Sequence, residues 1–121
     1  NGLEDINSFS TAADLSKFIK YLRTNSGYST LWDMLKLKSY HAEAKNGVAT
    51  HDFNTTNPFV GEPNILGGKT GFTPRALGNM ALVISGPNNA EFIYLVLGSY
   101  DREGDMRKLI DWVNQAWVWP Q

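Results

Sequence analysis

The residues of this sequence best suited to chemistry form one short run, Gly67-Gly68-Lys69-Thr70-Gly71. The Lys69 ammonium offers three hydrogen-bond donors and a positive charge, and the Thr70 hydroxyl can donate and accept. If the run is extended, successive side chains alternate between faces, so Lys69 and Gly71 share one face and Thr70 lies on the other. A glycine inside a strand often marks close approach by a ligand or another backbone. The run therefore predicts a cradle for a carboxylate or a developing oxyanion, with exposed backbone N–H groups near Gly71.

Two other interpretations compete for the same run. Gly68-Lys69-Thr70 resembles the end of a phosphate-binding Walker A loop, but Pro63 occupies the position of that loop's first glycine. A helix should also follow such a loop directly, whereas Pro74 and a strand-like stretch come next. The second alternative is a glycine-rich turn with a solvated lysine. A tripeptide alone does not exclude this turn, since short motif matches are often false.

Length and composition limit the classes of function. The 121 residues suffice for one domain with a core. The net charge of −1 does not indicate binding to nucleic acid or to a membrane surface, since both require an excess of basic residues. The absence of cysteine excludes disulfides and thiolate zinc sites, and no apolar run is long enough to span a bilayer. The sequence begins at Asn1 rather than Met, and we expect it to be part of a longer protein.

The spacing of apolar residues predicts two helices near the start of the chain. The first extends over about Thr11 to Thr24, with Thr11 and Asp14 forming a capping box. Its apolar stripe consists of Leu15, Phe18, Ile19 and Leu22. A second, shorter helix, with Ser29 as its cap, is predicted from the stripe Tyr28, Leu31, Trp32 and Leu35. The aromatic residues of this stripe favour a core role over cofactor binding.

A β-hairpin is predicted next. Asn46-Gly47 favours a type I′ turn, because both central residues of that turn need positive φ. The strands extend over about Leu37 to Lys45 and Val48 to Asn54. One face pairs Tyr40 with Phe53, Ala42 with His51 and Ala44 with Ala49, and the other pairs His41 with Asp52 and Glu43 with Thr50. Two His and one Asp are a weak metal ligand set, so we favour a solvated His41–Asp52 pair over a proton relay or metal site.

The second half of the chain predicts an antiparallel sheet followed by a helix. After a loop over 54–64, the Lys-Thr-Gly run and two apolar strands, Ala76 to Ser85 and Glu91 to Leu97, form a meander joined by short loops. The middle strand is apolar on both faces, which predicts a central position. The final helix carries the stripe Met106, Leu109, Ile110, Val113 and Trp117, ends at Pro120 and leaves Trp112 and Trp119 off the stripe. The expected fold class is α+β, with a three-strand meander and a hairpin packed with helices.

Taken together, these segments resemble the C-terminal part of a low-molecular-weight penicillin-binding protein, the serine D-alanyl-D-alanine carboxypeptidase family. The resemblance covers nearly the whole chain. Its most specific part is Gly68–Thr73, followed by Ala76 and Gly78-Asn79-Met80, which is similar to the family's third active-site motif and the next strand. Leu77 departs from that pattern at a position where a second small residue is common. The weaker matches are Asn1–Leu3, Ser10–Leu15, Leu97-Gly98, Arg102-Glu103 and Leu109–Trp112.

The resemblance implies a β-lactamase-like, transpeptidase-like fold and acyl transfer, in which a serine attacks the bond between two terminal D-alanines of a peptidoglycan stem peptide. It implies that Lys69, Thr70 and Gly71 form the catalytic strand, with Lys69 supplying positive potential and Thr70 binding the substrate carboxylate. Phe72, Thr73 and Arg102 are the implied substrate-binding residues. The Phe72 N–H would be an oxyanion donor, and Arg102 falls where some members hold a carboxylate-binding arginine. No metal and no cofactor are expected.

The family's nucleophile and proton shuttle, Ser-x-x-Lys and Ser-x-Asn, are absent from this sequence, since no serine has Lys three residues on or Asn two residues on. A nucleophile without a positioned base is weak. We therefore expect residues 1–121 to be one segment, the C-terminal part of a penicillin-binding-protein-like catalytic domain, and to be inactive alone. It would supply one wall of a site completed by the missing N-terminal portion, on the same polypeptide or on a cleaved partner.

The expected ligands are peptidoglycan stem peptides and β-lactams, and the resemblance implies an extracytoplasmic location, periplasmic or at the cell surface. Two alternatives stay open. The chain could be a non-catalytic module that binds peptidoglycan or another protein through a penicillin-binding-like fold, because the nucleophile is missing. The lone segment could also self-associate, because a sheet without its neighbours exposes edges and apolar surface.

Overall fold

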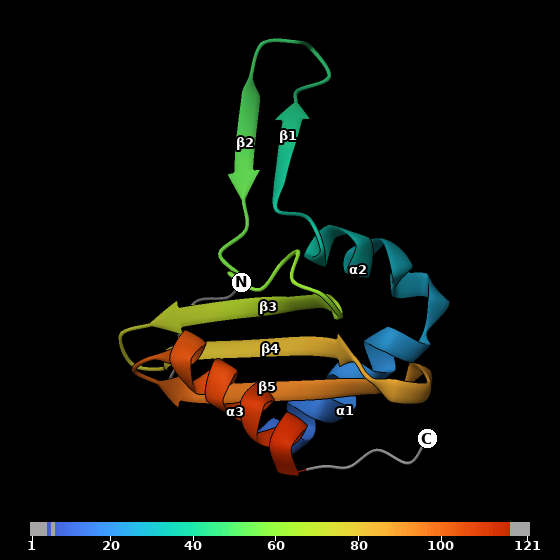
Figure 1. Cartoon of the computed structure of the whole chain (residues 1–121). Helices are drawn as coiled ribbons and strands as arrows, with labels where there is room; N and C mark the ends of the chain where they lie inside the picture. Colours follow the sequence, from blue (N-terminus) through green and yellow to red (C-terminus); the bar gives the residue numbers. More distant parts are fainter. Residues whose placement is uncertain (1–4, 6, 117–121) are drawn as a thin grey trace.

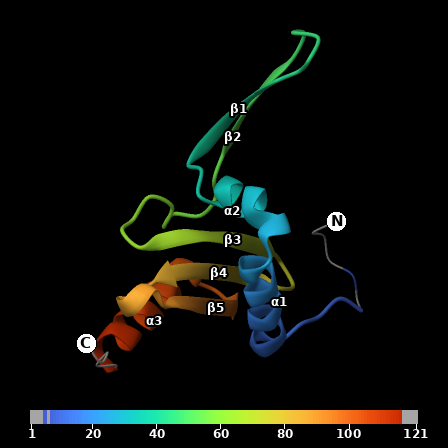
Figure 2. The ribbon, with the colours of Figure 1, turned by 90° about the vertical axis from the view of Figure 1, so that its right-hand side faces the viewer.

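The computed structural model describes residue 5 and residues 7–116. An antiparallel sheet lies at the centre, with the first and last helices on opposite faces (Figure 1; Figure 2). The second helix lies beside one edge strand, and a hairpin projects beyond the same edge. In chain order, the helices and strands are α1 (Ala12–Thr24), α2 (Ser29–Leu35), β1 (Ser39–Glu43), β2 (Thr50–Asn54), β3 (Ile65–Thr73), β4 (Leu77–Ser85), β5 (Glu91–Ser99) and α3 (Arg102–Ala116). The predicted α+β class is confirmed.

The central sheet has the strand order β3-β4-β5 with both pairs antiparallel, which is the predicted meander. Strand β4 lies in the middle, as its two apolar faces predicted. Its Leu82 and Ile84 belong to the core packed against α3, together with Tyr94 and Met106. Ala81 and Val83 face the side of the sheet that carries α1. Burial on both faces fixes β4, and β4 in turn fixes the position of β3.

The first helix begins as predicted. The Thr11 side chain accepts a hydrogen bond from the Asp14 N–H at 3.1 Å, so the N-cap half of the predicted capping box is confirmed. The Asp14 carboxylate reaches back to the Thr11 hydroxyl, which donates to it at 2.9 Å. An ion pair from Arg23 to Glu91 ties the end of α1 to β5. No residue of α1 is buried, however, and Phe18 is 57% exposed. The apolar stripe of α1 is therefore only partly covered.

The predicted cap of the second helix is wrong. Ser29 has helical backbone angles, φ −56° and ψ −45°, whereas an N-cap residue has an extended backbone. Ser29 is instead the first residue of α2, and a short 3-10 helix, Ser26–Tyr28, precedes it. The Asn25 side chain caps that turn by accepting from the Gly27 N–H at 2.9 Å. Trp32 is buried, in agreement with its predicted core role.

The hairpin has the predicted register, with His41 opposite Asp52 and Tyr40 opposite Phe53. The strands are shorter than predicted, and the predicted type I′ turn is wrong, because only Gly47 of the Asn46-Gly47 pair has positive φ, at 70°. The Gly47 N–H donates to the Ala44 carbonyl at 2.8 Å, and the Ala44 N–H donates to the Ala49 carbonyl at 2.8 Å. The turn is therefore centred one residue earlier, within a longer loop.

The turn between β3 and β4 contains the residue at which the sequence departs from the family pattern. Leu77 has a left-handed backbone with φ 57°, a conformation that costs an ordinary side chain about 1–2 kcal/mol. The Asn79 side chain fastens this turn by donating to the carbonyls of Ala76 and Leu77 at 3.1 and 3.0 Å. The predicted roles of Asn1–Leu3, Trp117, Trp119 and Pro120 lie outside the described residues.

Candidate functional site

The Lys-Thr-Gly run lies on β3, which is an edge strand among the described residues. Its hydrogen-bonded neighbour is β4, with Lys69 opposite Ala81, Thr70 opposite Met80 and Gly71 opposite Asn79. The projecting hairpin stands beyond β3 without pairing to it (Figure 1). The predicted alternation is present, because Lys69 and Gly71 are exposed and Thr70 is only 6% exposed. An unpaired strand edge offers backbone groups to an extended ligand.

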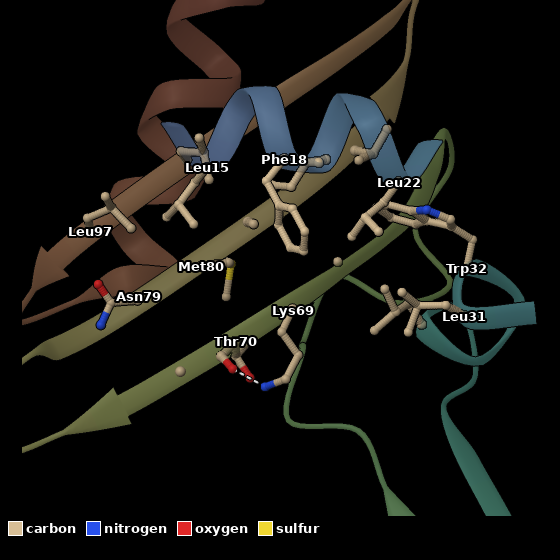
Figure 3. Close-up of a pocket in the computed structure, with 17 residues that line it drawn as sticks. Leu15, Phe18, Leu22, Leu31, Trp32, Lys69, Thr70, Asn79, Met80 and Leu97 are labelled. Atoms are coloured by element: carbon tan, nitrogen blue, oxygen red, sulfur yellow. Dashed lines mark hydrogen bonds between the residues drawn. The ribbon is translucent and has the colours of Figure 1, made fainter. Parts of the chain in front are cut away.

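Lys69 and Thr70 make different contacts. The Lys69 ammonium donates a hydrogen bond to the carbonyl of Thr70, the residue next to it (Figure 3). The Thr70 hydroxyl lies 2.5 Å from the Thr56 hydroxyl, in the loop that follows the hairpin. Thr56 was read from the sequence only as part of a loop, and no motif marked it. The structure thus adds Thr56 to the surroundings of the predicted residues.

The glycines of β3 differ in the space around them. A Cβ added to Gly68 would lie 2.4 Å from the Ala81 carbonyl oxygen and 2.6 Å from Leu82 Cδ2. A Cβ added to Gly71 would have only Asn79 Cβ within 4 Å, at 3.9 Å. Gly68 is therefore required by the packing of β3 on β4. Gly71 lies in open space, where a ligand could approach the backbone.

Arg102 reaches the same strand from the start of α3. Its Nη1 donates to the Gly71 carbonyl at 3.0 Å. The backbone of this helix start is fixed by Asp101, whose carboxylate accepts from the Gly104 N–H at 2.9 Å. Ser99 supports the same corner, because its hydroxyl donates to Asp105 at 2.6 Å and accepts from the Asp101 N–H at 2.9 Å. The hydrogen bond from Ser99, with one from Lys108, lowers the pKa of Asp105.

The remaining predicted residues extend the strand toward its turn. Phe72 pairs with Gly78, and its side chain is 67% exposed. The Thr73 hydroxyl accepts from the Ala76 N–H at 3.0 Å, so it takes part in the turn. The structure thus brings Lys69, Thr70, Gly71 and Arg102 together, with Phe72 beside them and Thr73 at the end of the strand.

Two hollows meet at the Lys-Thr-Gly run. The first, which we call the α1 hollow, is a cavity of about 380 Å³ between α1, α2 and the sheet (Figure 3). The second, the hairpin hollow, is a cavity of about 710 Å³ between α2, the hairpin and β3. Gly68, Lys69 and Thr70 line both. Other residues of the α1 hollow are almost all apolar, and include Leu15, Phe18, Leu22, Leu31, Trp32, Met80 and Leu97.

The charge around the run is positive. Lys69 lines both hollows, and no acidic residue from the part of the chain that the structure describes lines either of them. Arg102 adds a second cation beside Gly71. Cations with fixed backbone donors in a partly enclosed site favour an anionic ligand or a developing negative charge. This electrostatic pattern agrees with the carboxylate or oxyanion cradle expected from the sequence.

The hairpin carries the histidines and the aspartate that the sequence offered as a weak metal ligand set. Among the described residues, no group of three or more His, Cys, Asp or Glu side chains is arranged to hold an ion. The His41 ring nitrogen Nδ1 lies 2.5 Å from Asp52, and both side chains are more than half exposed. His41 and Asp52 therefore form a solvated cross-strand pair, the interpretation that the sequence favoured.

Comparisons with known proteins identify the fold. No family model matches the chain, and neither does any curated protein. Among solved structures, a mutant of the Streptomyces K15 DD-transpeptidase matches with a TM-score of 0.74 and 26% identity, over 93% of this chain and 45% of that chain. The D-alanyl-D-alanine carboxypeptidase from Mycobacterium tuberculosis matches with a TM-score of 0.71 and 21% identity, over 99% of this chain and 46% of that one.

The chain therefore has the fold of penicillin-binding proteins and transpeptidases. The resemblance predicted from the sequence is confirmed, because the matching structures are a DD-transpeptidase and a D-alanyl-D-alanine carboxypeptidase. The chain spans less than half the length of these structures, 45% and 46%. No helix in the described part of the chain is long and apolar enough to cross a membrane.

Proposed function

We propose that this chain is the C-terminal part of a serine-type D-Ala-D-Ala carboxypeptidase that acts on peptidoglycan stem peptides. One observation carries the proposal. Lys69 and Arg102 donate to two successive carbonyls, those of Thr70 and Gly71, on a strand that has only one neighbour in the described part of the chain. This chain has the fold of the DD-peptidases. The match to a transpeptidase at 26% identity and the positive charge of the site support it.

The proposed reaction forms and breaks an ester. A serine oxygen from outside this chain attacks the carbonyl carbon between the two D-alanines, and the terminal D-alanine leaves with a proton. Water then hydrolyses the acyl-enzyme and restores the serine. Lys69 contributes positive potential near the nucleophile, and Thr70 hydrogen-bonds the substrate carboxylate. Because residues two apart on a strand direct their backbone groups to the same side, the Phe72 N–H shares a side with the Thr70 carbonyl and can donate to the oxyanion.

The serine and its base would come from an upstream portion of the same domain. The α1 hollow is suited to receive that upstream portion. The hollow is lined by an apolar stripe of α1 that has no buried residue, and it ends at Lys69 and Gly71. Exposed apolar surface of this kind marks an interaction site. A segment seated there would place its polar residues beside the Lys-Thr-Gly strand. Residues 1–121 then form one wall of the site, as expected from the missing Ser-x-x-Lys and Ser-x-Asn.

A fluorescent penicillin tests the proposal. The intact polypeptide that contains this chain should be labelled covalently, and residues 1–121 alone should not. Lys69→Ala should lower the labelling rate on the order of a hundredfold, the scale of losing one electrostatic contact to the developing charge. The matched control, Lys45→Ala in the exposed hairpin loop, should label like the wild type. An unlabelled intact polypeptide with an upstream Ser-x-x-Lys would refute the enzyme assignment.

A second candidate is a non-catalytic module that binds peptidoglycan or another protein. The absence of any Ser-x-x-Lys in this sequence favours it. The parent reading frame separates the two, because an upstream Ser-x-x-Lys supports the enzyme and its absence supports the module. Peptidoglycan as the ligand implies an extracytoplasmic location, both for the enzyme and for a module that binds peptidoglycan. The enzyme would also bind β-lactams.

A further inference from the structure

The Thr70 hydroxyl contacts a second hydroxyl that belongs to no recognised motif. The Oγ1 atoms of Thr56 and Thr70 lie 2.5 Å apart in a partly buried position. Both residues line the hairpin hollow, and Thr70 is only 6% exposed. The two hydroxyl oxygens are within hydrogen-bonding distance, and either of them can be the donor. Thr56 therefore touches the residue proposed to bind the substrate carboxylate.

The backbone on either side of Thr56 is anchored. The Thr55 N–H donates to the Lys38 carbonyl at 2.9 Å, and the Asn57 N–H donates to the Thr55 hydroxyl at 3.2 Å. The Asn57 side chain then accepts from the N–H of Phe59 at 3.1 Å, and Phe59 is fully buried. Thr56 is thus held between two anchors. The backbone that carries the Thr56 hydroxyl is therefore fixed on both sides.

The direction of the proton between the two hydroxyls matters for ligand binding. A hydroxyl has one proton to donate and two lone pairs. If Thr70 donates to Thr56, it can offer an anion only lone pairs, which repel it. If Thr56 donates to Thr70, the Thr70 proton is free for the anion, and the two bonds polarise each other cooperatively. Lys69 next to Thr70 favours an anionic ligand, and such a ligand selects the second arrangement.

We propose that Thr56 is a positioning residue that acts through Thr70. It donates its proton to Thr70 Oγ1 and so leaves the Thr70 proton to the carboxylate of the substrate or of a β-lactam. This inference rests on the proposed function, because it assigns Thr56 a part in carboxylate binding at the same site. It adds a residue that lies 14 positions before Thr70.

The test measures the second-order rate of acylation of the intact polypeptide by a fluorescent penicillin. Thr56→Val removes the hydroxyl and keeps the branched shape, and should lower the rate about fivefold to tenfold, the scale of one lost hydrogen bond to a polar group. Thr56→Ser restores the hydroxyl and should stay within about twofold of the wild type. In a Thr70→Val background, Thr56→Val should have no further effect, since its action passes through Thr70. Thr50→Val on the exposed strand β2 is the matched control and should label normally.

The outcomes separate this inference from the proposed function. An unlabelled wild type refutes the proposed function and the inference with it. A labelled wild type with Thr56→Val equally fast refutes only the inference. Equal losses for Thr56→Val and Thr56→Ser, or an undiminished effect of Thr56→Val in the Thr70→Val background, show a structural role and also overturn it. If thermal denaturation shows that Thr56→Val does not fold, Thr56→Ala is compared with Thr56→Ser by the same criteria.

Discussion

Two glycines of strand β3 allow a matched test of how the strand is used. Neither Gly68 nor Gly71 has positive φ, so alanine is compatible with the backbone at both positions. At Gly68 a new methyl group would lie 2.4 Å from the Ala81 carbonyl oxygen, which belongs to the neighbouring strand β4. At Gly71 the nearest atom, Asn79 Cβ, is 3.9 Å away. The same substitution should therefore affect stability at one position and ligand binding at the other.

The magnitudes follow from the contacts. Gly68→Ala must push two paired strands apart, and overpacking of this kind costs about 1–3 kcal/mol or more. For a domain of roughly 60–100 residues, each kcal/mol lowers the midpoint of thermal unfolding by about 4–8 °C, and somewhat less for a larger one. Gly71→Ala should be neutral or stabilise by up to about 1 kcal/mol, because alanine restricts the unfolded chain more than glycine does. Its methyl group would stand on the exposed face of β3, where the ligand is proposed to approach.

A methyl group in the path of the ligand should weaken acylation. If the bound ligand is packed as closely as a protein core, the added group costs about 1–3 kcal/mol, or roughly fivefold to a hundredfold in rate. The assay combines thermal denaturation with labelling by a fluorescent penicillin, both on the intact polypeptide. We expect Gly71→Ala to keep the wild-type midpoint and lose labelling. Full labelling of a stable Gly71→Ala protein would show that no ligand approaches this face, and an unchanged midpoint for Gly68→Ala would contradict the close β3–β4 contact.

Three further predictions concern a cation, an ion pair and a turn. Arg102→Lys keeps the charge but loses the planar donor that bonds the Gly71 carbonyl, so acylation should fall roughly tenfold, and a wild-type rate would remove Arg102 from the site. The hydrogen bond from Arg23 lowers the pKa of Glu91 in the folded protein. The ion pair therefore contributes fully to the free energy of unfolding above the unfolded glutamate pKa of about 4.3, and this contribution is lost as the pH falls through the lower pKa of the folded state. Glu91→Gln should reduce the free energy of unfolding in urea by about 0.5–1 kcal/mol at neutral pH and abolish this acid dependence; a difference that persists in acid would point to another cause. Gly47→Ala should cost about 1–2 kcal/mol by thermal denaturation, because Gly47 has positive φ. Asn46→Ala should cost less, since it loses only the exposed hydrogen bond that Asn46 Oδ1 accepts from the Val48 N–H, and equal costs would favour the type I′ turn.

The sheet could be predicted because its signals are local and mutually consistent. A strand that is apolar on both faces fits only the centre of a sheet, and β4 has Leu82 and Val83 almost completely buried. The hairpin register also followed from the positions of the polar and apolar pairs. The turn type did not, because Asn46 tolerates either sign of φ. The last ladder bond, from the Ala44 N–H to the Ala49 carbonyl, leaves a loop longer than two residues.

The site was predictable only as far as the strand itself. The alternation of Lys69 and Thr70 follows from extended geometry, and the open space at Gly71 follows from the absence of a side chain. The Thr56 hydroxyl reaches Thr70 only because the chain returns from the hairpin across the start of β3, which no local pattern encodes. Arg102 reaches the strand because Asp101 fixes the start of α3 beside the β3–β4 turn. Both contacts depend on tertiary placement.

Strand β3 must satisfy two opposing demands. A strand that binds an extended peptide needs an unpaired edge, yet such an edge, next to uncovered apolar surface, invites pairing with other copies of the chain. The packing of Gly68 against β4 and the buried Thr70 hold the strand rigid from one side, so its edge can stay free without losing its shape. The demand for protection from self-association is not met within the described residues, since the apolar stripe of α1 that lines the α1 hollow is only partly covered. A cover supplied by the upstream portion would bring the serine to the strand and remove the surface through which the isolated segment would self-associate.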